Sequence, residues 1–280
     1  MSERFGFGKN WQDYIRDLDE SRIGRAEQSL RDMTGLESFA GKTFLDIGCG
    51  SGLLSLAARR LGAKVTSFDY DPDSVAAAKG LKEKFFPDDN AWQIARGDVL
   101  DPQYMAGLGV FDIVYSWGVL HHTGNMHKAF GHAAAAVNSN GLLFIAIYND
   151  EGRYSRMWLA IKKLYNLLPN DHLKKAMVIF IAVLLEARLA AGRVLSLKDP
   201  LPRWKERNTQ SLRGMSVWHD YVDWVGGLPF EVAKSDEIFR LFRERGFELE
   251  NMTTVGRGHG CNEFVFRRKS EAASLLRTGT

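Results

Sequence analysis

A glycine-rich turn between an apolar segment and a helix-like segment constrains this chain most. Residues 45–52 read Leu-Asp-Ile-Gly-Cys-Gly-Ser-Gly. Glycine removes the side chains that would hold a ligand away from the backbone, and it allows a tight strand-to-helix turn whose amide N–H groups point outward. The turn therefore predicts an α/β protein that binds a nucleoside-bearing ligand at this point.

The spacing of the glycines disfavours a dinucleotide. The dinucleotide fingerprint is Gly-x-Gly-x-x-Gly, whereas Gly48, Gly50 and Gly52 alternate with single residues and Asp46 precedes them. A carboxylate beside the turn would repel a pyrophosphate, but it can accept hydrogen bonds from an ammonium group or a water. The pattern thus favours a zwitterionic or cationic ligand over NAD, and an NAD-dependent dehydrogenase is kept as an alternative.

Acidic residues also follow the next two expected strands. A strand over 64–68 ends at Asp69, about twenty residues after Gly48, where a βαβ unit places a carboxylate on ribose hydroxyls. Asp71 and Pro72 read as a helix N-cap and first helical position, so Asp71 receives a structural role. A third strand over 92–96 leads into Gly97, Asp98 and Val99.

A fourth strand over 111–115 opens into Ser-Trp-Gly-Val-Leu-His-His-Thr at 116–123. Together with the glycine turn and the acids at 69 and 98, this segment resembles the class I S-adenosylmethionine-dependent methyltransferases, over residues 42–147. The resemblance implies S-adenosyl-L-methionine as the cofactor. In that family the residue at Asp98 reaches the adenine amino group, the backbone of the next residue lies beside the ring, and the segment after the fourth strand faces the substrate.

The resemblance assigns cofactor contacts to the residues at the ends of the four strands. These are Asp46, Gly48, Cys49, Gly50, Gly52, Asp69, Tyr70, Asp98, Val99, Ser116, Trp117 and Gly118. Trp11, on an expected N-terminal helix, either covers the cofactor or packs against the core.

The order of elements predicts a Rossmann-like sheet. Helices over 53–61, 72–86 and 126–137 alternate with the strands, and a fifth strand covers 141–147, which implies a parallel sheet. A helix over 235–245 and strands over 247–255 and 263–268 follow, and the strands form an antiparallel hairpin. We therefore expect a seven-stranded, mostly parallel sheet that ends in this hairpin.

Three segments surround or interrupt this plan. N-terminal helices in 1–40 would cover the cofactor site, a methyltransferase core would comprise 41–150 and 231–270, and 151–230 would form a helical cap between strands five and six. Within this insertion, Met177–Leu185 is an apolar run that is too short to span a bilayer. It predicts a cap, a homodimer contact or peripheral contact with a membrane surface, and no integral span.

Histidines supply the candidate bases for the transfer reaction. His121 and His122 follow the fourth strand, where substrate should meet cofactor, and adjacent residues point in different directions, so at most one should face the acceptor. The alternative is that both make structural hydrogen bonds. His219, next to Asp220 in an aromatic segment, is a further candidate base. A metal site is not expected, because no third ligand stands at a defined spacing.

Composition restricts the partners. The 280 residues carry a formal net charge of +3, and Lys and Arg cluster densely only near 267–269, so nucleic-acid binding is not expected. The two cysteines and an N-terminus without an apolar core indicate a cytoplasmic protein.

These observations predict methyl transfer to a small-molecule acceptor, most plausibly at oxygen. The resemblance is strongest to the branch that contains quinone-biosynthesis O-methyltransferases, although the helical insertion has no simple counterpart there. Two further alternatives stay open: a non-catalytic S-adenosylmethionine-binding or interaction protein, and a lipid or quinone methyltransferase at the membrane surface.

Overall fold

The computed structural model describes residues 18–196, 217–256 and 260–270, and the side chains of 217–220 lie outside this description. The chain divides into two compact units. Unit 1 comprises residues 1–151 and 229–280, and unit 2 is the segment Gly152–Leu228. The cap role predicted for the insertion stays a prediction.

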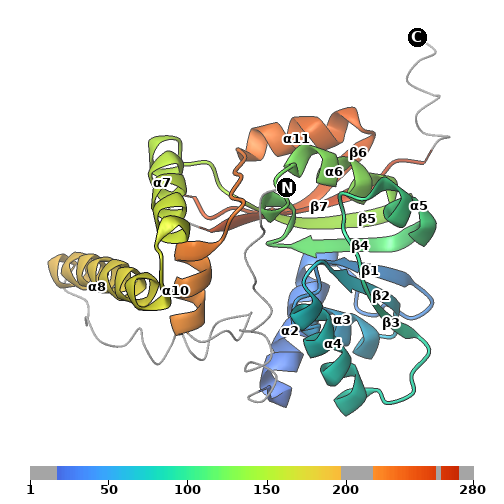
Figure 1. Ribbon diagram of the computed structural model, residues 1–280. Coiled ribbons are helices and arrows are strands. Elements are labelled where there is room, and N and C mark those ends of the chain that lie inside the picture. Colours follow the sequence, from blue (N-terminus) through green and yellow to red (C-terminus); the bar gives the residue numbers. More distant parts are fainter. Residues whose placement is uncertain (1–17, 197–216, 257–259, 271–280) are drawn as a thin grey trace, which may run out of the picture. The chain divides into compact units, whose positions relative to one another are not determined.

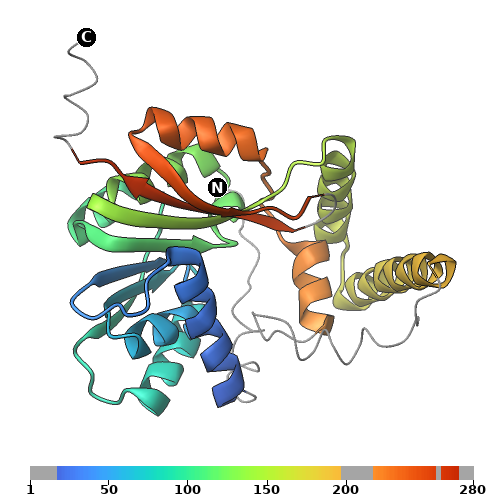
Figure 2. The same ribbon diagram turned by 180° about the vertical axis from the view of Figure 1, so that it is seen from behind.

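Unit 1 contains a seven-stranded sheet with the order β3-β2-β1-β4-β5-β7-β6 (Figures 1 and 2). The first five strands are parallel, while β7 pairs antiparallel with both β5 and β6. The predicted α/β class with an antiparallel C-terminal hairpin is confirmed. The strands are β1 (Thr43–Ile47), β2 (Lys64–Asp69), β3 (Trp92–Arg96), β4 (Phe111–Trp117), β5 (Val137–Tyr148), β6 (Phe247–Thr253) and β7 (Cys261–Arg268).

Helices cover both faces of the sheet, and each face has its own apolar cluster. Side chains of α5, α6 and α11 pack on one face, and those of α2, α3 and α4 pack on the other. The helices are α2 (Glu20–Thr34), α3 (Leu53–Arg60), α4 (Pro72–Phe85), α5 (Pro102–Leu108), α6 (Met126–Ala135) and α11 (Ser235–Glu244). The carboxyl ends of the parallel strands, where ligands bind in such sheets, are therefore held by two apolar layers.

Local sequence signals explain most helix starts. Asp71 caps α4 by accepting a hydrogen bond from the Asp73 amide, with Pro72 at the first helical position, as predicted. The short α5 was not predicted, although Asp101 and Pro102 repeat the same signal. Only seven residues long, α5 shows no clear apolar period. The helix expected near Trp11 lies outside the described residues.

Unit 2 consists of helices in its described part: α7 (Arg153–Leu167), α8 (Asp171–Leu195) and α10 (Val217–Gly226). The Lys162 ammonium donates to the Trp224 carbonyl oxygen, and the rings of Trp158 and Trp224 lie 5.5 Å apart. The proline-marked break expected at 199–202 lies outside the description. Among the described helices, none has the length and apolar character needed to cross a membrane.

Candidate cofactor and acceptor site

The glycine turn lies between β1 and α3, at the carboxyl end of the sheet. The amides of Gly48 and Cys49 donate to the Phe68 carbonyl oxygen at the end of β2, with lengths of 2.8 and 3.1 Å. Gly48 has a φ of +76°, and a Cβ there would stand 2.4 Å from a methyl carbon of Val119. Glycine is thus required here both for the backbone conformation and for the close approach of the segment after β4.

Asp69 stands at the end of β2 and holds the turn. Its carboxylate oxygens accept hydrogen bonds from the amides of Gly50 and Asp71, both at 2.9 Å. Burial raises the pKa of Asp69 to about 6, against the lowering effect of these amides. An ionised carboxylate oxygen can accept more than one hydrogen bond, so Asp69 keeps the capacity to accept from ribose hydroxyls. Its ligand role stays a prediction.

Asp46 lies beneath the turn rather than at its surface, with 2% of its area exposed. Its carboxylate accepts a 2.5 Å hydrogen bond from the Ser55 hydroxyl, which also lies 2.7 Å from the Ser67 hydroxyl. The Trp92 indole N–H donates to Ser67 at 3.0 Å. Burial, followed by the charge of Asp69, raises the pKa of Asp46 to about 7 despite the Ser55 hydrogen bond. Asp46 therefore anchors the floor of the turn.

The end of β3 brings Asp98 and Val99 to the same edge. The Asp98 carboxylate accepts from the Leu100 amide at 2.9 Å, and Val99 is buried. A Cβ at Gly97 would collide with the Tyr104 ring. The Tyr104 hydroxyl is buried, and it has no hydrogen-bond partner among the described residues. Tyr104 was not predicted as a site residue, because it lies on the unpredicted α5.

The end of β4 closes the other side of the turn. The Ser116 hydroxyl donates to the Ile47 carbonyl oxygen at 3.0 Å, which ties β4 to β1. Trp117 donates its indole N–H to Glu263 on β7 at 2.7 Å. Gly118 donates to the Ala146 carbonyl oxygen at 3.1 Å. The four predicted strand ends thus converge on one edge of the sheet.

His121 and His122 form a single 3₁₀ turn, Leu120–His122, but their environments differ. His121 is fully buried, and its ring centroid lies 3.9 Å from that of Tyr148. The Tyr148 amide approaches His121 Nδ1 at 3.4 Å. Since an amide N–H only donates, Nδ1 acts as the acceptor, and Nε2 carries the proton of the neutral ring.

His122 is half-buried and has the opposite tautomer. Its Nδ1 lies 2.6 Å from the Pro229 carbonyl oxygen. A carbonyl oxygen only accepts, so Nδ1 must donate, and Nε2 of the neutral ring carries the lone pair. His122 is therefore the histidine whose second nitrogen is set up to accept a proton.

The segment Pro229–Glu231 supports this turn, and sequence reasoning did not predict its role. The Glu231 amide donates to the His121 carbonyl oxygen at 3.0 Å. The Glu231 carboxylate accepts from the Met126 amide at 3.0 and 3.2 Å, at the start of α6. These contacts join residues more than a hundred positions apart, for which neither spacing nor periodicity provides a signal.

For two predicted site residues, Trp11 and His219, the structure does not describe the side chain, and a third, Tyr70, is exposed. Trp11 lies outside the described residues. His219 falls within α10 of unit 2, and its side chain is outside the description. Tyr70 follows Asp69 and is 44% exposed, with the Arg96 guanidinium over its ring.

The thiol of Cys49 is buried within the turn. Burial, and secondarily the charges of Asp69 and Asp46, raise its pKa well above the usual range. The group therefore stays protonated, which does not suit a nucleophile or a metal ligand. Within residues 18–196, 217–256 and 260–270, no group of three or more His, Cys, Asp or Glu side chains could hold a metal ion.

Comparison with known sequences decides the family. The family model described as a methyltransferase domain matches residues 18–180, which is more than half of the chain. The chain belongs to this methyltransferase domain family. The predicted resemblance to S-adenosylmethionine-dependent methyltransferases is thereby confirmed, and S-adenosyl-L-methionine is the cofactor that the family indicates. The dehydrogenase alternative is set aside.

Curated relatives of this methyltransferase domain protein include ubiquinone biosynthesis O-methyltransferases. The protein of Methylobacterium sp. (strain 4-46) is 37% identical over 137 residues, covering 49% of this chain and 50% of the relative. That of Rhodopseudomonas palustris (strain HaA2) is 33% identical over 137 residues, with 49% of each chain covered. The chain thus spans about half the length of these relatives.

Solved structures that share this fold include methyltransferases. Magnesium protoporphyrin IX methyltransferase from Synechocystis PCC 6803 with bound SAH has a TM-score of 0.54 and 14% identity. The match covers 93% of this chain and 94% of that one. An O-methyltransferase family protein from Burkholderia thailandensis has a TM-score of 0.52 and 17% identity, over 87% of this chain and 56% of the other.

Proposed function

We propose that this methyltransferase domain protein transfers a methyl group from S-adenosyl-L-methionine to an oxygen of a small-molecule acceptor, with His122 as the general base. The observation that carries the proposal is the tautomer of His122, at a turn that packs against the glycine loop through Val119. Sequence similarity to O-methyltransferases over half of the chain supports oxygen as the acceptor atom.

The residues at the sheet edge fit this cofactor. Gly48 leaves no room for a Cβ, because the Val119 side chain packs against it and brings the segment after β4 to the glycine turn. Asp69 places an acid beside the turn, which suits a cationic ligand and opposes a pyrophosphate, while Asp46 supports the turn from beneath. The buried hydroxyl of Tyr104 near the end of β3, which has no hydrogen-bond partner among the described residues, provides a further polar group at this edge. When bound, the cofactor supplies an electrophilic methyl group on a sulfonium.

The chain itself contributes position and proton transfer. In-line displacement needs the acceptor oxygen about 3 to 3.5 Å from the methyl carbon, on the side opposite the sulfur, with water excluded. His122 Nε2 would accept the hydroxyl proton as the new bond to carbon forms. The Pro229 carbonyl oxygen, which accepts from Nδ1, orients the ring and stabilises the imidazolium that results. His121 has the opposite tautomer and is assigned a structural role.

The test compares two neighbouring substitutions. Purified protein is incubated with S-adenosyl-L-methionine and a panel of phenols and catechols, and the demethylated cofactor is quantified. We expect His122→Gln to lower turnover by about 10²- to 10⁴-fold, which is the usual contribution of a general base. Cofactor affinity, measured by calorimetry, should stay within about twofold, because His122 does not hold the cofactor.

His121→Gln and Asp69→Asn serve as the controls. Asp69→Asn should weaken cofactor binding, since a charge-assisted hydrogen bond to ribose is lost. A folded His122→Gln protein with normal turnover would contradict base catalysis at this residue. Binding of the cofactor with no transfer to any acceptor of the panel would favour the alternative of a non-catalytic binding protein.

A further inference from the structure

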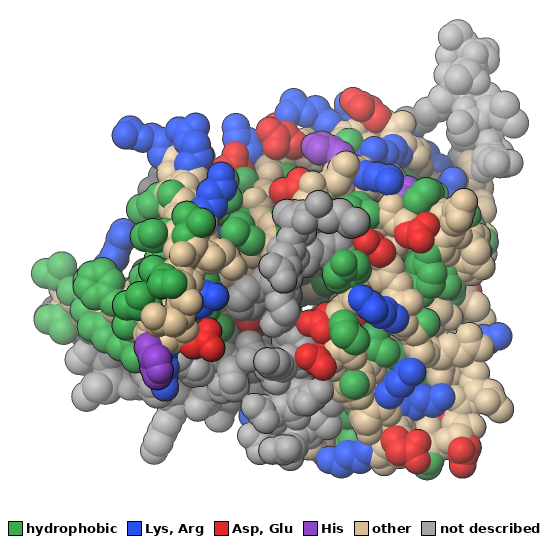
Figure 3. All heavy atoms as spheres, viewed as in Figure 1, with side chains coloured by type: hydrophobic (Ala, Val, Ile, Leu, Met, Phe, Trp, Pro, Cys, Tyr) green, Lys and Arg blue, Asp and Glu red, His purple; other side chains and the backbone are tan. Residues whose placement is uncertain are grey.

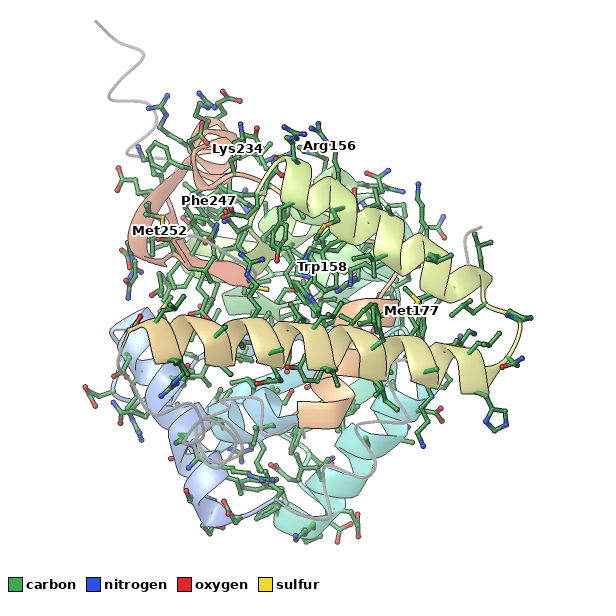
Figure 4. All side chains as sticks on the ribbon, turned by 90° about the vertical axis from the view of Figure 1, so that its left-hand side faces the viewer. Arg156, Trp158, Met177, Lys234, Phe247 and Met252 are labelled. Atoms are coloured by element: carbon green, nitrogen blue, oxygen red, sulfur yellow. The ribbon has the colours of Figure 1, made fainter. Side chains whose placement is uncertain are left out.

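The long helix α8 of unit 2 exposes apolar side chains along one face. We define the α8 stripe as Leu173, Ile179, Phe180, Val183, Leu184, Val194 and Leu195, which are all at least 46% exposed. Phe180 and Val183 at its centre reach 63% and 61%. Hydrophobic side chains gather over α8 in Figure 3, and Figure 4 shows the helix crossing the view. Isolated apolar residues on a surface are ordinary, but a continuous stripe marks a contact surface.

The face of α8 opposite the stripe, and one edge of the stripe, already have contacts within unit 2. Val178 is buried with 1% of its area exposed. The Glu186 carboxylate accepts a hydrogen bond from the Tyr221 hydroxyl of α10. These contacts fix the rotation of the helix about its axis, so the α8 stripe is the face that the described part of unit 2 leaves uncovered.

Positive charges border the α8 stripe. A helix turns by about 100° per residue, so Arg188 falls on one flank of the stripe and Lys175 on the other, which also carries Glu186, and both cations are exposed. Over its whole length α8 carries four cations, Lys174, Lys175, Arg188 and Arg193, against two acids, Asp171 and Glu186. Glu186 is already engaged by Tyr221. An apolar face with cationic flanks is the pattern of a helix that lies in the interface of a lipid bilayer.

The neighbouring helix α7 repeats this combination. Its exposed positions include Met157, Leu164 and Leu167. The exposed charges on the same helix are cationic, Arg153, Arg156 and Lys163. Apolar and basic side chains are therefore mixed on both helices, whereas acidic side chains are scarce on them.

The charges on α8 distinguish two possible partners of the stripe, a second copy of the chain and a lipid surface. Two-fold pairing of α8 with itself would set the cationic flanks of one copy against those of the other, with few acids to neutralise them. An anionic headgroup layer neutralises both flanks and accepts the apolar side chains between them. We propose that unit 2 binds the surface of an anionic lipid bilayer through the α8 stripe, with Lys175 and Arg188 directed to the headgroup phosphates.

The experiment uses the full chain and vesicles of defined composition. Co-sedimentation is measured with phosphatidylcholine vesicles and with vesicles that also contain phosphatidylglycerol. We expect binding to the anionic vesicles, weaker binding to phosphatidylcholine alone, and a loss of binding as salt is raised. Since the assay involves no methyl transfer, its result is separate from that of the proposed function.

Two double variants distinguish the apolar and the electrostatic contributions. Phe180→Ser with Leu184→Ser should lower the partition coefficient on anionic vesicles by about tenfold or more, because two exposed apolar anchors are lost. Lys175→Gln with Arg188→Gln should remove most of the preference for anionic vesicles. All these positions are exposed, so the unfolding midpoint should not fall. The matched control, Val110→Ser with Met252→Ser, removes exposed apolar groups of unit 1 and should bind like the wild type.

Three results would overturn the proposal. They are failure of the wild type to bind anionic vesicles, equal binding by the Phe180 and Leu184 variant, and light scattering that shows a wild-type dimer which this variant converts to monomer. The last result would assign the α8 stripe to a second copy of the chain.

Discussion

At the scale of single residues, the two adjacent histidines show how backbone contacts assign chemistry. His121 Nδ1 faces an amide donor and His122 Nδ1 faces a carbonyl oxygen, so the rings take opposite tautomers. The donors and acceptors belong to Tyr148 and Pro229, which are distant in sequence. Residue type alone therefore identified the pair, while its partners distinguished the two members.

Asp46 leads to a prediction about pH. Its pKa rises from the usual 3.8 to about 7 on folding, so the folded chain binds this proton more tightly than the unfolded chain. Stability should then fall as pH rises from about 4 to about 7. Asp46→Asn stays neutral and should lose this dependence, a difference of about 2 to 4 kcal/mol at about 1.4 kcal/mol per pKa unit.

Urea unfolding of both proteins at pH 5 and pH 8 measures this difference. Other carboxylates are common to the two proteins, so the comparison isolates Asp46. If the free energies of unfolding of wild type and Asp46→Asn change in parallel between the two pH values, burial does not hold the proton on Asp46.

At the scale of elements, loops rather than helices and strands complete the site. The strands deliver their carboxyl ends to one edge, but the segment Pro229–Glu231 fixes the turn that carries both histidines and the start of α6. The Asn125 side chain also accepts from the Lys128 amide at this helix start. Two separate acceptors thus satisfy amides that a helix N-terminus leaves without intrahelical partners.

Removal of one of these acceptors should destabilise unit 1. Glu231→Ala deletes the carboxylate that accepts from the Met126 amide, and we expect a loss of about 1 kcal/mol in the free energy of unfolding. Glu231→Gln keeps one acceptor oxygen and should lose less. Chemical denaturation of the three proteins measures the order, and equal stability of Glu231→Ala and wild type would show that water replaces the carboxylate without cost.

At the scale of the whole molecule, each unit has its own internal contacts. Unit 1 is organised around the sheet with its two apolar clusters. Unit 2 is organised around Lys162, Trp158 and Trp224. The Lys162 amine is buried, and this burial lowers its pKa to about 7, while the charge of Asp223 opposes the change.

We expect calorimetry of the full chain to resolve two unfolding transitions. S-adenosylhomocysteine should raise only the unit 1 transition, by about 2.7 kcal/mol of stabilisation at a concentration a hundred times its dissociation constant. Lys162→Ala should lower only the other transition, by about 2 to 3 kcal/mol, because packing and a buried hydrogen bond are lost. A single transition that both changes move together would contradict this division.

The sequence by itself determined the glycine turn, the acids at the strand ends and the order of strands and helices. These depend on local spacing, on backbone freedom at glycine and on alternating apolar segments, which are readable over a few residues. It also pointed to His121 and His122 and to the helical insertion. The short α5, which carries Tyr104, was not predicted, because seven residues do not establish a helical period of apolar side chains.

Only the tertiary structure decided how these parts act. Asp46 is buried and supports the glycine turn from beneath. The carbonyl oxygen of Pro229, which is distant in sequence, sets the tautomer of His122. The rotation of α8 left one apolar face of that helix uncovered within the described part of unit 2. Each of these outcomes depends on contacts between residues far apart along the chain, and the free energy of such contacts arises only when the folded backbone brings them together.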